Sequence, residues 1–338
     1  MLEIDGSFLE GGGQILRTAL ALSCITKKRI RVVRIRAKRE NPGLRPQHII
    51  CVKALSQICG AKVIGSDVGA LEIEFEPKKI QGGPYSFDVG TAGSVSLVLQ
   101  SILPVFAFSD KSKVRIRGGT HVPLSPTIHY VQNVLLPFLG KMGYAVTCEL
   151  LRYGWYPRGG GEVSIETNTA SLVAFSPKPA DTMVYGISCV SNLPISIAER
   201  QAKSARKEIW DRLGVECRIA CEQGDASSPG TAITLWCGFI GSSSLGKIGK
   251  SAEAVGIDAA KELCKQIDSG ATVDKHLADQ ILPYAALSKG ISEFKVSEIT
   301  LHTRTNAWVI GLFLDSKIEI VEEEGLIRVH GSGFNPSF

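Results

Sequence analysis

One histidine stands among residue types that suit phosphoryl chemistry. His302 lies in the stretch Leu301-His302-Thr303-Arg304-Thr305-Asn306, which an apolar run with helical spacing follows. A β-rich segment, 295–301, precedes it, so the pattern predicts an imidazole at the end of a strand, where open α/β sheets hold ligands. A neutral imidazole is nucleophilic near pH 7. We interpret His302 as a candidate nucleophile that carries a nucleotide; the alternative is a hydrogen-bonded residue at a strand end.

A glycine-rich turn near the N-terminus is a candidate anion site. It reads Glu10-Gly11-Gly12-Gly13-Gln14-Ile15-Leu16-Arg17 and joins a predicted strand to a predicted helix. Glycines let the backbone approach a ligand, and free N–H groups at a helix start attract anions. Gln14 and Arg17 share a helix face, and Glu10 could hold a metal ion against a phosphate. The Gly-Lys-Ser/Thr ending of a Walker loop is absent, and a tight turn with a capping acid stays the alternative.

Basic residues are concentrated between positions 27 and 45, where only one acid, Glu40, occurs. Arg36 and Arg39 end a predicted strand there, while Gln47 and His48 open the next predicted helix. All four should therefore lie at one edge of the sheet, and guanidinium forks suit phosphate oxygens. The stretch is either a phosphate-binding edge or a solvated strand face. The net charge of +5 is too modest to imply nucleic acid by itself.

Two further segments could contact a nucleotide. The turn Gly90-Thr91-Ala92-Gly93-Ser94 leads into a predicted helix that carries Gln100. The segment His276-Leu277-Ala278-Asp279-Gln280 opens another predicted helix. Its ring, acid and amide could read a purine, although a capping acid and exposed polar residues explain the same spacing equally well.

The cysteines do not form a metal-binding or disulfide pattern. There are nine, most of them in apolar runs, and no Cys-x-x-Cys occurs. Cys217 and Cys221 could share a strand face, but no second ligand pair follows, so the pattern does not favour zinc. His121 and His129 have no obvious partner and are interpreted as structural. The N-terminus lacks signal-peptide features and no apolar stretch is long enough for a bilayer, so we expect a cytoplasmic protein with no membrane contact.

The elements that must position these residues follow a repeated order, β-α-β-α-β-β, with a period of about 80 residues. The first unit has strand 2–5, helix 13–26, strand 30–36, helix 46–58 and strands 61–66 and 71–76. The second has strand 84–88, helix 93–107, strand 113–117, helix 126–142 and strands 143–150 and 161–166. The third starts at 171–176 and resumes with helix 273–287, strand 295–301, helix 305–314 and strands 317–321 and 325–330.

An insertion interrupts the third unit. It is predicted as strand 183–190, helix 196–213, strands 215–221 and 231–239, and helix 251–267. The expected fold class is therefore α/β (α+β), with three β-α-β-α-β-β units in a large domain and a smaller α/β domain inserted in the third. We expect the large domain to comprise 1–180 and 273–338, and the small domain to comprise 181–272.

The segments above, taken together, resemble the RNA 3′-terminal phosphate cyclase family. The matching segments are Glu10-Gly-Gly-Gly-Gln14-Ile-Leu-Arg17, Arg36-Ala-Lys-Arg39, Asn41-Pro-Gly-Leu-Arg-Pro-Gln47-His48, Gly118-Gly-Thr120, Tyr156-Pro-Arg-Gly-Gly-Gly-Glu162, Leu277-Ala-Asp-Gln280 and His302-Thr-Arg-Thr-Asn306. The resemblance covers nearly the whole chain. It implies three such units with a smaller domain in the third, and a unit similar to those of enolpyruvate transferases.

The resemblance also implies an ATP-dependent ligase that converts an RNA 3′-terminal phosphate to a 2′,3′-cyclic phosphodiester. In that reaction a histidine attacks the α-phosphorus of ATP, with a divalent metal such as Mg or Mn, and a histidyl-AMP intermediate and pyrophosphate result. AMP then passes to the RNA 3′-phosphate, giving an RNA-adenylate. The neighbouring 2′-hydroxyl closes the ring and releases AMP. The implied partners are ATP and 3′-phosphate RNA, and a homo-oligomer stays open.

Site roles carry over position by position. The resemblance assigns His302 to the nucleophile and Glu10 to the metal. It assigns ATP contacts to Gln14, Arg17, Arg39, Gln100, Pro126, His276, Leu277, Ala278, Asp279 and Gln280, and phosphate or RNA contacts to Arg36, Gln47, His48 and Asn306. His276 stands where family members often carry tyrosine, so stacking on adenine survives but the hydroxyl contact is lost.

Two other classes of protein share parts of this pattern. Cyclase-like ribosome-assembly factors have the fold without the nucleophile, and His302 in its Thr-Arg-Thr-Asn context argues against them. An enolpyruvate-type transferase would need two such globular halves. Three units with a different insertion argue against that class.

Overall fold

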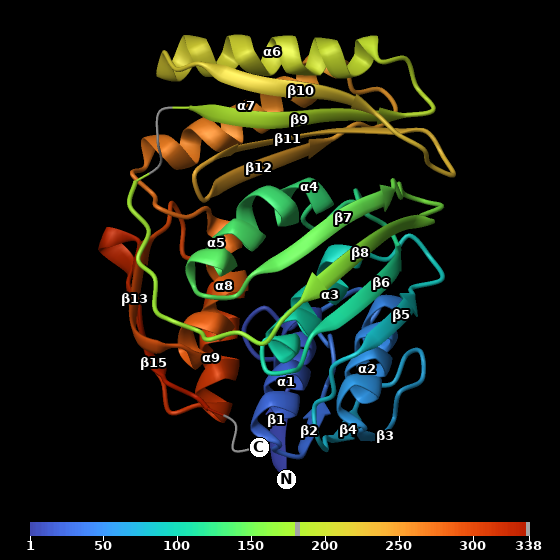
Figure 1. The fold of residues 1–338 in the computed structure, drawn as a ribbon, viewed down its shortest axis with the longest axis vertical. Coiled ribbons are helices and arrows are strands. Elements are labelled where there is room, and N and C mark those ends of the chain that lie inside the picture. The colour runs from blue at the N-terminus through green and yellow to red at the C-terminus, as the bar shows by residue number, and fades with distance from the viewer. Residues whose placement is uncertain (180–182, 336–338) are drawn as a thin grey trace.

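The structure, a computed structural model, describes residues 1–179 and 183–335. Within these residues the strands form separate sheets joined by helices, and Figure 1 shows them as a lower body with a further sheet above it. In the N-terminal sheet the strand order is β1-β2-β4-β3, from β1 (Leu2–Asp5), β2 (Ile30–Val33), β3 (Lys62–Ile64) and β4 (Ile73–Glu76). β1 runs parallel to β2, and the other neighbours are antiparallel.

Helices cover one face of this sheet and salt bridges cover the other. Ile30 and Val32 are fully buried under α1 (Gly13–Thr26) and α2 (Pro46–Cys59). The alternate residue Arg31 pairs with Glu72 and Glu3 on the exposed face, at 2.8 and 3.3 Å. This alternation of apolar and charged residues is typical of a strand with one buried face.

The second unit repeats that topology. Its strand order is β5-β6-β8-β7, from β5 (Pro84–Asp88), β6 (Ser112–Gly118), β7 (Val146–Arg152) and β8 (Gly161–Thr167), with β5 parallel to β6. Its helices are α3 (Val95–Phe106) and a longer stretch made of α4 (Ile128–Tyr130), a π-helical segment (Val131–Leu135) and α5 (Leu136–Lys141).

The third unit has the order β13-β15-β14, from β13 (Lys289–Lys295), β14 (Lys317–Val321) and β15 (Leu326–Ser332). Its helices are α8 (Lys275–Leu287) and α9 (Leu301–Phe313). A parallel bridge between Val173 and Lys289 puts the 171–176 segment where the other units have their first strand. The predicted fold class, with its repeated order, is confirmed.

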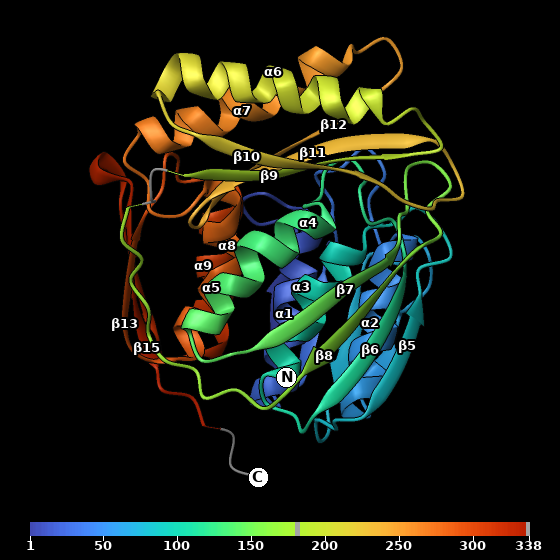
Figure 2. The ribbon, with the colours of Figure 1, turned by 45° about the horizontal axis from the view of Figure 1, so that its top comes forward.

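The segment 184–268 builds its own sheet. Its order is β10-β9-β11-β12, from β9 (Val184–Ser191), β10 (Cys217–Gln223), β11 (Gly230–Cys237) and β12 (Ile240–Leu245). Helices α6 (Ser196–Leu213) and α7 (Ala252–Asp268) lie over its outer face (Figure 2), where Ile209, Leu235 and Leu263 form a separate apolar core. The predicted domain boundary at 180/181 lies outside the described residues, and the domain division stays a prediction.

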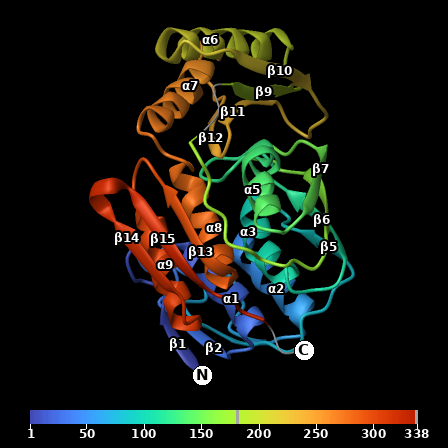
Figure 3. The same ribbon diagram turned by 60° about the vertical axis from the view of Figure 1, so that its left-hand side comes forward.

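The helices of the three repeat units pack against one another between their sheets (Figure 3). Helix α1 contacts α2, α3 and α9, and α8 contacts α9. Fully buried side chains such as Leu20, Phe106 and Ile281 fill this core. In the part of the chain that the structure describes, no helix combines the length and apolarity needed to cross a bilayer.

Some predicted boundaries are wrong for local reasons. The predicted strand 30–36 ends at Val33, because Arg34 and Arg36 adopt positive φ angles of 51° and 54°, which a strand does not allow. The predicted strand 231–239 is a hairpin that turns at Gly238, and β12 was not predicted. The predicted strand 295–301 is absent: β13 ends at Lys295 and a helix begins at Leu301.

Candidate active site

The first turns of several helices supply the residues around His302. His302 is the second residue of α9, and the side chain of the N-cap Thr300 accepts a hydrogen bond from the Thr303 N–H at 3.1 Å. The prediction of a strand end is therefore wrong, because a Thr cap starts a helix there in spite of the β-favouring residues before it. Gln14 lies in the first turn of α1, and Asp279 lies one turn into α8. Helix N-termini favour bound anions, so this position suits phosphate chemistry.

A relay of three side chains fixes His302. The Gln14 amide nitrogen donates to Asp279 Oδ2 at 2.7 Å, and Gln14 Oε1 forms a hydrogen bond with His302 Nδ1. Only the NH₂ end of an amide can donate to a carboxylate, so Asp279 sets the orientation of the Gln14 side chain. Gln14 then presents an oxygen to the imidazole, and His302 Nδ1 must carry the proton. The lone pair of the neutral ring is consequently on Nε2.

The surroundings keep this imidazole neutral. Partial burial, then the nearby charges of Arg17, Arg39 and His276, lower the pKa of His302 to about 4. Its side chain stays exposed on one side. At neutral pH His302 is therefore an unprotonated, accessible base beside two guanidinium groups, which is the state a nucleophile needs.

Asp279 has the opposite shift. Burial raises the pKa of Asp279 to about 7, although the nearby Arg17 charge partly opposes that rise. Arg17 makes no hydrogen bond or ion pair among the described residues; one of its guanidinium nitrogens lies near Gly13, and its charge acts on both Asp279 and His302. A guanidinium left without a direct partner in such a place suits a phosphate ligand.

Buried polar groups join the helices that carry the relay. Asn306 is only 3% exposed; its oxygen accepts from Thr18 Oγ1 at 2.7 Å and its nitrogen donates to the Asp279 carbonyl at 2.7 Å. Thr305 Oγ1 accepts from the Glu10 N–H at 3.3 Å. These bonds tie α9 to α1, α8 and the glycine-rich turn. The polar atoms of Asn306 are thus engaged, and its expected contact with phosphate or RNA stays a prediction.

Glu10 lies deep in the glycine-rich turn. Its side chain is 7% exposed and forms an ion pair with Arg39. Apart from this contact of Arg39 with Oε1, neither carboxylate oxygen accepts a hydrogen bond from the described residues. The carboxylate lies so close to Gly12 that a Cβ there would collide with it. A buried anion with unfilled acceptor positions is a fitting ligand for a hard divalent cation.

The basic stretch divides into two groups. Arg31 on β2, and Arg29 and Arg34 just before and after it, form exposed ion pairs with acids, so the solvated-face interpretation holds for these three. Arg36 differs: its guanidinium donates to the Asn41 and Gly43 carbonyls at 2.7 and 2.9 Å, and partial burial lowers its pKa.

His48 and its neighbours complete the cationic side of the site. The His48 ring is 2% exposed, and its Nδ1 accepts from the Arg45 backbone N–H at 3.2 Å. Burial, then the charges of Arg17, Arg36 and Arg45, lower the pKa of His48 to about 3. A Cβ at Gly13 would collide with His48 Nε2, so the first turns of α1 and α2 meet here. Gln47 is half-buried beside Gly93.

The segment 276–280, which was predicted to contact the nucleotide, is only partly connected to the residues around His302. His276 is exposed on α8 and close enough for its charge to affect His302. Leu277 and Ala278 are fully buried, and the Gln280 amide donates to the His276 carbonyl at 2.7 Å.

Gln100 and Pro126 are not connected to His302 by hydrogen bonds within residues 1–179 and 183–335. Gln100 is half-buried on α3, and the Pro126 carbonyl accepts from Ser96 Oγ at 2.7 Å. Their roles stay predictions.

No site role was predicted for Thr18, Thr305 or Arg45, although each holds part of the site. Thr18 follows Gln14 by one helical turn, so its place on the same face was a usable signal. The bond between Thr18 and Asn306 joins positions 288 residues apart and has no local signal.

Comparisons with known proteins agree over nearly the whole chain. A sequence model described as RNA 3′-terminal phosphate cyclase matches residues 8–320. Proteins named RNA 3′-terminal phosphate cyclase from Methanosarcina mazei and Pyrococcus furiosus are each 45% identical, over 97% of this chain and 99% and 98% of theirs. The one from Archaeoglobus fulgidus is 44% identical, over 97% of this chain and 100% of its own. Among solved structures, the enolpyruvyl transferase NikO from Streptomyces tendae matches with a TM-score of 0.41 at 9% identity, covering 98% of this chain and 48% of that one.

Proposed function

The chain belongs to the RNA 3′-terminal phosphate cyclase family, and we propose that it uses ATP to convert an RNA 3′-terminal phosphate into a 2′,3′-cyclic phosphodiester. The observation that carries the proposal is the position of His302, a neutral imidazole whose Nδ1 is held by Gln14 and whose Nε2 makes no hydrogen bond within residues 1–179 and 183–335. The names of the relatives, which match along their whole length, support the same reaction.

In the first step His302 is the nucleophile. Its Nε2 lone pair forms a bond to the α-phosphorus of ATP, while the bond from that phosphorus to the bridging oxygen breaks and pyrophosphate leaves. His302 Nδ1–H keeps its hydrogen bond to Gln14 Oε1 throughout, and this bond stabilises the positive charge that develops on the ring. Asp279, through Gln14, keeps the proton on that nitrogen.

The guanidinium groups stabilise the charge on the phosphoryl oxygens. Arg17 and Arg39 are the cations that act on His302, so both are placed to bind the phosphates of ATP. Gln47 and His48 lie on the adjacent first turn of α2, and Arg36 lies in the turn between β2 and that helix. We assign all three to a phosphate of ATP or of the RNA end. Helix N-termini at α1, α2 and α9 add backbone donors to the same region.

A divalent ion, Mg²⁺ or Mn²⁺, fits beside Glu10. Its carboxylate is buried, and Arg39, its charge partner, is the one donor in contact with it among the described residues. Magnesium is commonly held by one carboxylate together with substrate phosphates, where it supplies charge neutralisation. Binding would bring Glu10 away from Arg39 and leave that guanidinium for a phosphate.

The nucleotide base is assigned to the surface of α8. The exposed His276 ring could stack on adenine, and Gln280, Gln100 and Pro126 complete the proposed ATP contacts. After AMP transfer to the RNA 3′-phosphate, attack by the 2′-hydroxyl closes the ring and expels AMP. We also propose a cytoplasmic location.

Labelling with α-labelled ATP tests the covalent intermediate. The protein, incubated with ATP and Mg²⁺ or Mn²⁺ and then denatured, should retain AMP through an acid-labile phosphoramidate. His302→Ala and His302→Asn should remove both this label and the cyclisation of a 3′-phosphate oligonucleotide while the protein stays folded. Undiminished labelling of folded His302→Ala would exclude His302 as the nucleophile.

A further inference from the structure

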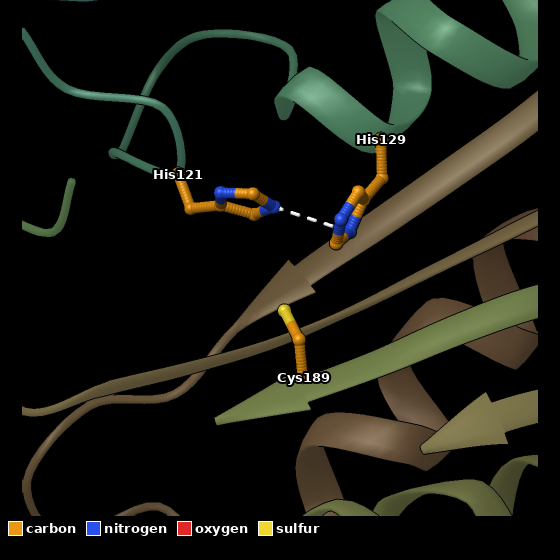
Figure 4. A group of neighbouring side chains, drawn as sticks. All are labelled: His121, His129 and Cys189. Carbon is orange, nitrogen blue, oxygen red and sulfur yellow. Dashed lines mark hydrogen bonds between the residues drawn. The ribbon is translucent and has the colours of Figure 1, made fainter. Parts of the chain in front are cut away.

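A second group of side chains with metal-ligand chemistry lies away from the His302 site. His121 lies in the loop after β6, His129 lies in α4 and Cys189 lies on β9 (Figure 4). They are 1%, 3% and 0% exposed. One ligand atom from each, two imidazole nitrogens and the thiol sulfur, lies within 4.8 Å of the other two. We propose that these three residues form a binding site for a zinc ion.

The observed spacing is close to that of a tetrahedral site. His121 Nε2 and His129 Nδ1 are 3.3 Å apart. Zinc–nitrogen bonds of about 2.0–2.1 Å in a tetrahedron place two nitrogens about 3.3 Å apart, and a zinc–sulfur bond of about 2.3 Å places the sulfur about 3.6 Å from each. The two imidazole nitrogens are therefore at the separation that a shared zinc ion requires, and the sulfur needs to approach by no more than about 1.2 Å.

The residue types select the metal. Imidazole nitrogen and thiolate sulfur suit zinc, whereas magnesium, calcium and manganese prefer oxygen ligands. The cluster thus differs in kind from Glu10, whose single carboxylate suits a hard ion. The proposal is accordingly independent of the proposed cyclase reaction.

Neighbouring polar groups already hold the unused ring nitrogens. Thr120 Oγ1 is 2.9 Å from His121 Nδ1, and the Tyr153 hydroxyl is 3.4 Å from His129 Nε2 and 3.1 Å from Glu222 Oε2. Since Tyr153 donates to the Glu222 carboxylate, its oxygen accepts the His129 Nε2 proton. His129 Nδ1 then carries a lone pair, which accepts a hydrogen bond from His121 Nε2–H. Such partners on the far nitrogens are what metal-bound histidines use.

The protons balance on binding. His129 already presents Nδ1 as a lone pair. The proton on His121 Nε2 moves to Nδ1, where Thr120 Oγ1 accepts it, and the Thr120 hydroxyl turns toward the Gly154 carbonyl at 3.5 Å. Cys189 loses its thiol proton to solvent. One proton is released per zinc ion, and each imidazole keeps a hydrogen-bond partner.

A cavity supplies access and a fourth ligand. It has a volume of about 590 Å³, and His129, Tyr153 and Glu222 are among the residues that line it. Glu222 Oε2 lies 3.9 Å from His129 Nε2, the nitrogen on the far side of the ring from the proposed ion, so a water molecule from the cavity would complete the tetrahedron. Because Cys189 belongs to the 184–268 sheet and both histidines belong to the second repeat unit, the ion would fasten the two together.

Cobalt(II) is a direct probe, because a cobalt–thiolate bond gives an intense charge-transfer band in the near ultraviolet. We expect the full-length protein, freed of metal with a chelator, to bind Co²⁺ with this band and with the visible spectrum of a tetrahedral site. Zn²⁺ should displace the cobalt and raise the melting temperature. Cobalt bound at Glu10 would have oxygen ligands and would give no thiolate band.

Matched variants identify the ligands. Cys189→Ala should lose the band, whereas Cys264→Ala, an equally buried cysteine on α7, and Cys221→Ser, an exposed one, should retain it. His121→Gln should weaken cobalt binding at least tenfold, whereas His330→Gln on β15 should not. The proposal is overturned if the wild type shows no thiolate band or if folded Cys189→Ala keeps it. If Cys189→Ala does not fold, undiminished cobalt binding by His121→Gln overturns it.

Discussion

At the scale of single residues, the protonation of His302 depends on an acid that does not touch it. Gln14 separates Asp279 from the imidazole, and its amide can turn only one way while Asp279 is an acceptor. A protonated Asp279 could donate to the amide oxygen instead. The reversed amide would then donate to His302 Nδ1 and move the ring proton to Nε2, where it blocks the nucleophilic lone pair. The charge on Asp279 therefore selects the reactive tautomer.

Asp279→Asn tests this relay. An asparagine can donate or accept at this position, so it no longer fixes the Gln14 amide. Loss of a charge-assisted hydrogen bond costs about 1.5–3 kcal/mol, which predicts a tenfold to hundredfold slower labelling by ATP in a single turnover. His302 is still present, so some label should form. Labelling at the wild-type rate would show that Asp279 does not control the tautomer.

The dependence of labelling on pH separates the two titrating groups. His302, with its pKa lowered to about 4, stays neutral down to that pH, whereas Asp279, with its pKa raised to about 7, gains a proton as pH falls through 7. We expect the wild-type labelling rate to fall in two steps, near pH 7 and near pH 4. The upper step should be absent from Asp279→Asn. A single step near the ordinary histidine pKa of about 6.5 in both proteins would contradict this assignment.

At the scale of the elements, the basic stretch 27–45 has two parts with different roles. Arg31 is on β2 and faces acids, while Arg36 and Arg39 follow that strand in a turn that leads to the first turn of α2. A strand that ended later would have put all of them on one solvated face. The positive φ angles at Arg34 and Arg36 turn the chain toward the site.

Alanine substitutions in this stretch should therefore give unequal effects. Arg36→Ala and Arg39→Ala should each slow a step by about tenfold to a hundredfold, because a charge-assisted contact with phosphate is lost. Arg31→Ala is the matched control and should leave the rates of labelling and cyclisation close to those of the wild type, because its ion pairs are exposed. Loss of both labelling and cyclisation would place an arginine on ATP, and loss of cyclisation alone would place it on the RNA. Equal, near-wild-type rates for all three would return the whole stretch to a solvated face.

The repeated order of elements could be predicted from sequence because apolar periodicity is local. The start of α9 could not, since Glu298, Ile299 and Thr300 have no pattern that separates a strand end from an extended cap residue. The relay of Asp279, Gln14 and His302 could not be predicted either, because it depends on contacts between α1, α8 and α9, which are far apart in the sequence. His121, His129 and Cys189 were interpreted as ordinary buried residues, because their common location depends on how the 184–268 sheet packs.

At the scale of the whole molecule, one buried carboxylate joins the 184–268 sheet to α8, the helix that carries Asp279. Asp274 is the N-cap of α8 and is 0% exposed. It accepts from the His276 and Leu277 N–H groups at 2.9 and 2.8 Å. It also accepts from the Gly241 N–H on β12 at 2.9 Å and from the Tyr130 hydroxyl on α4 at 2.7 Å. The helix that presents Asp279 is thus held by donors from three parts of the chain.

Removing this carboxylate should destabilise the protein by more than the loss of a helix cap alone. Asp274→Ala leaves the Tyr130 hydroxyl and the Gly241 N–H buried without an acceptor, so we expect the unfolding free energy to fall by about 3–5 kcal/mol. Ser251→Ala is the control: it removes the N-cap of α7, whose donor is exposed, and should cost about 1 kcal/mol. The loss of unfolding free energy for Tyr130→Phe should lie between those of Asp274→Ala and Ser251→Ala. Urea unfolding of the three variants measures the difference, and equal losses for Asp274→Ala and Ser251→Ala would mean that Asp274 acts as a cap alone and does not hold the sheet to the active-site helix.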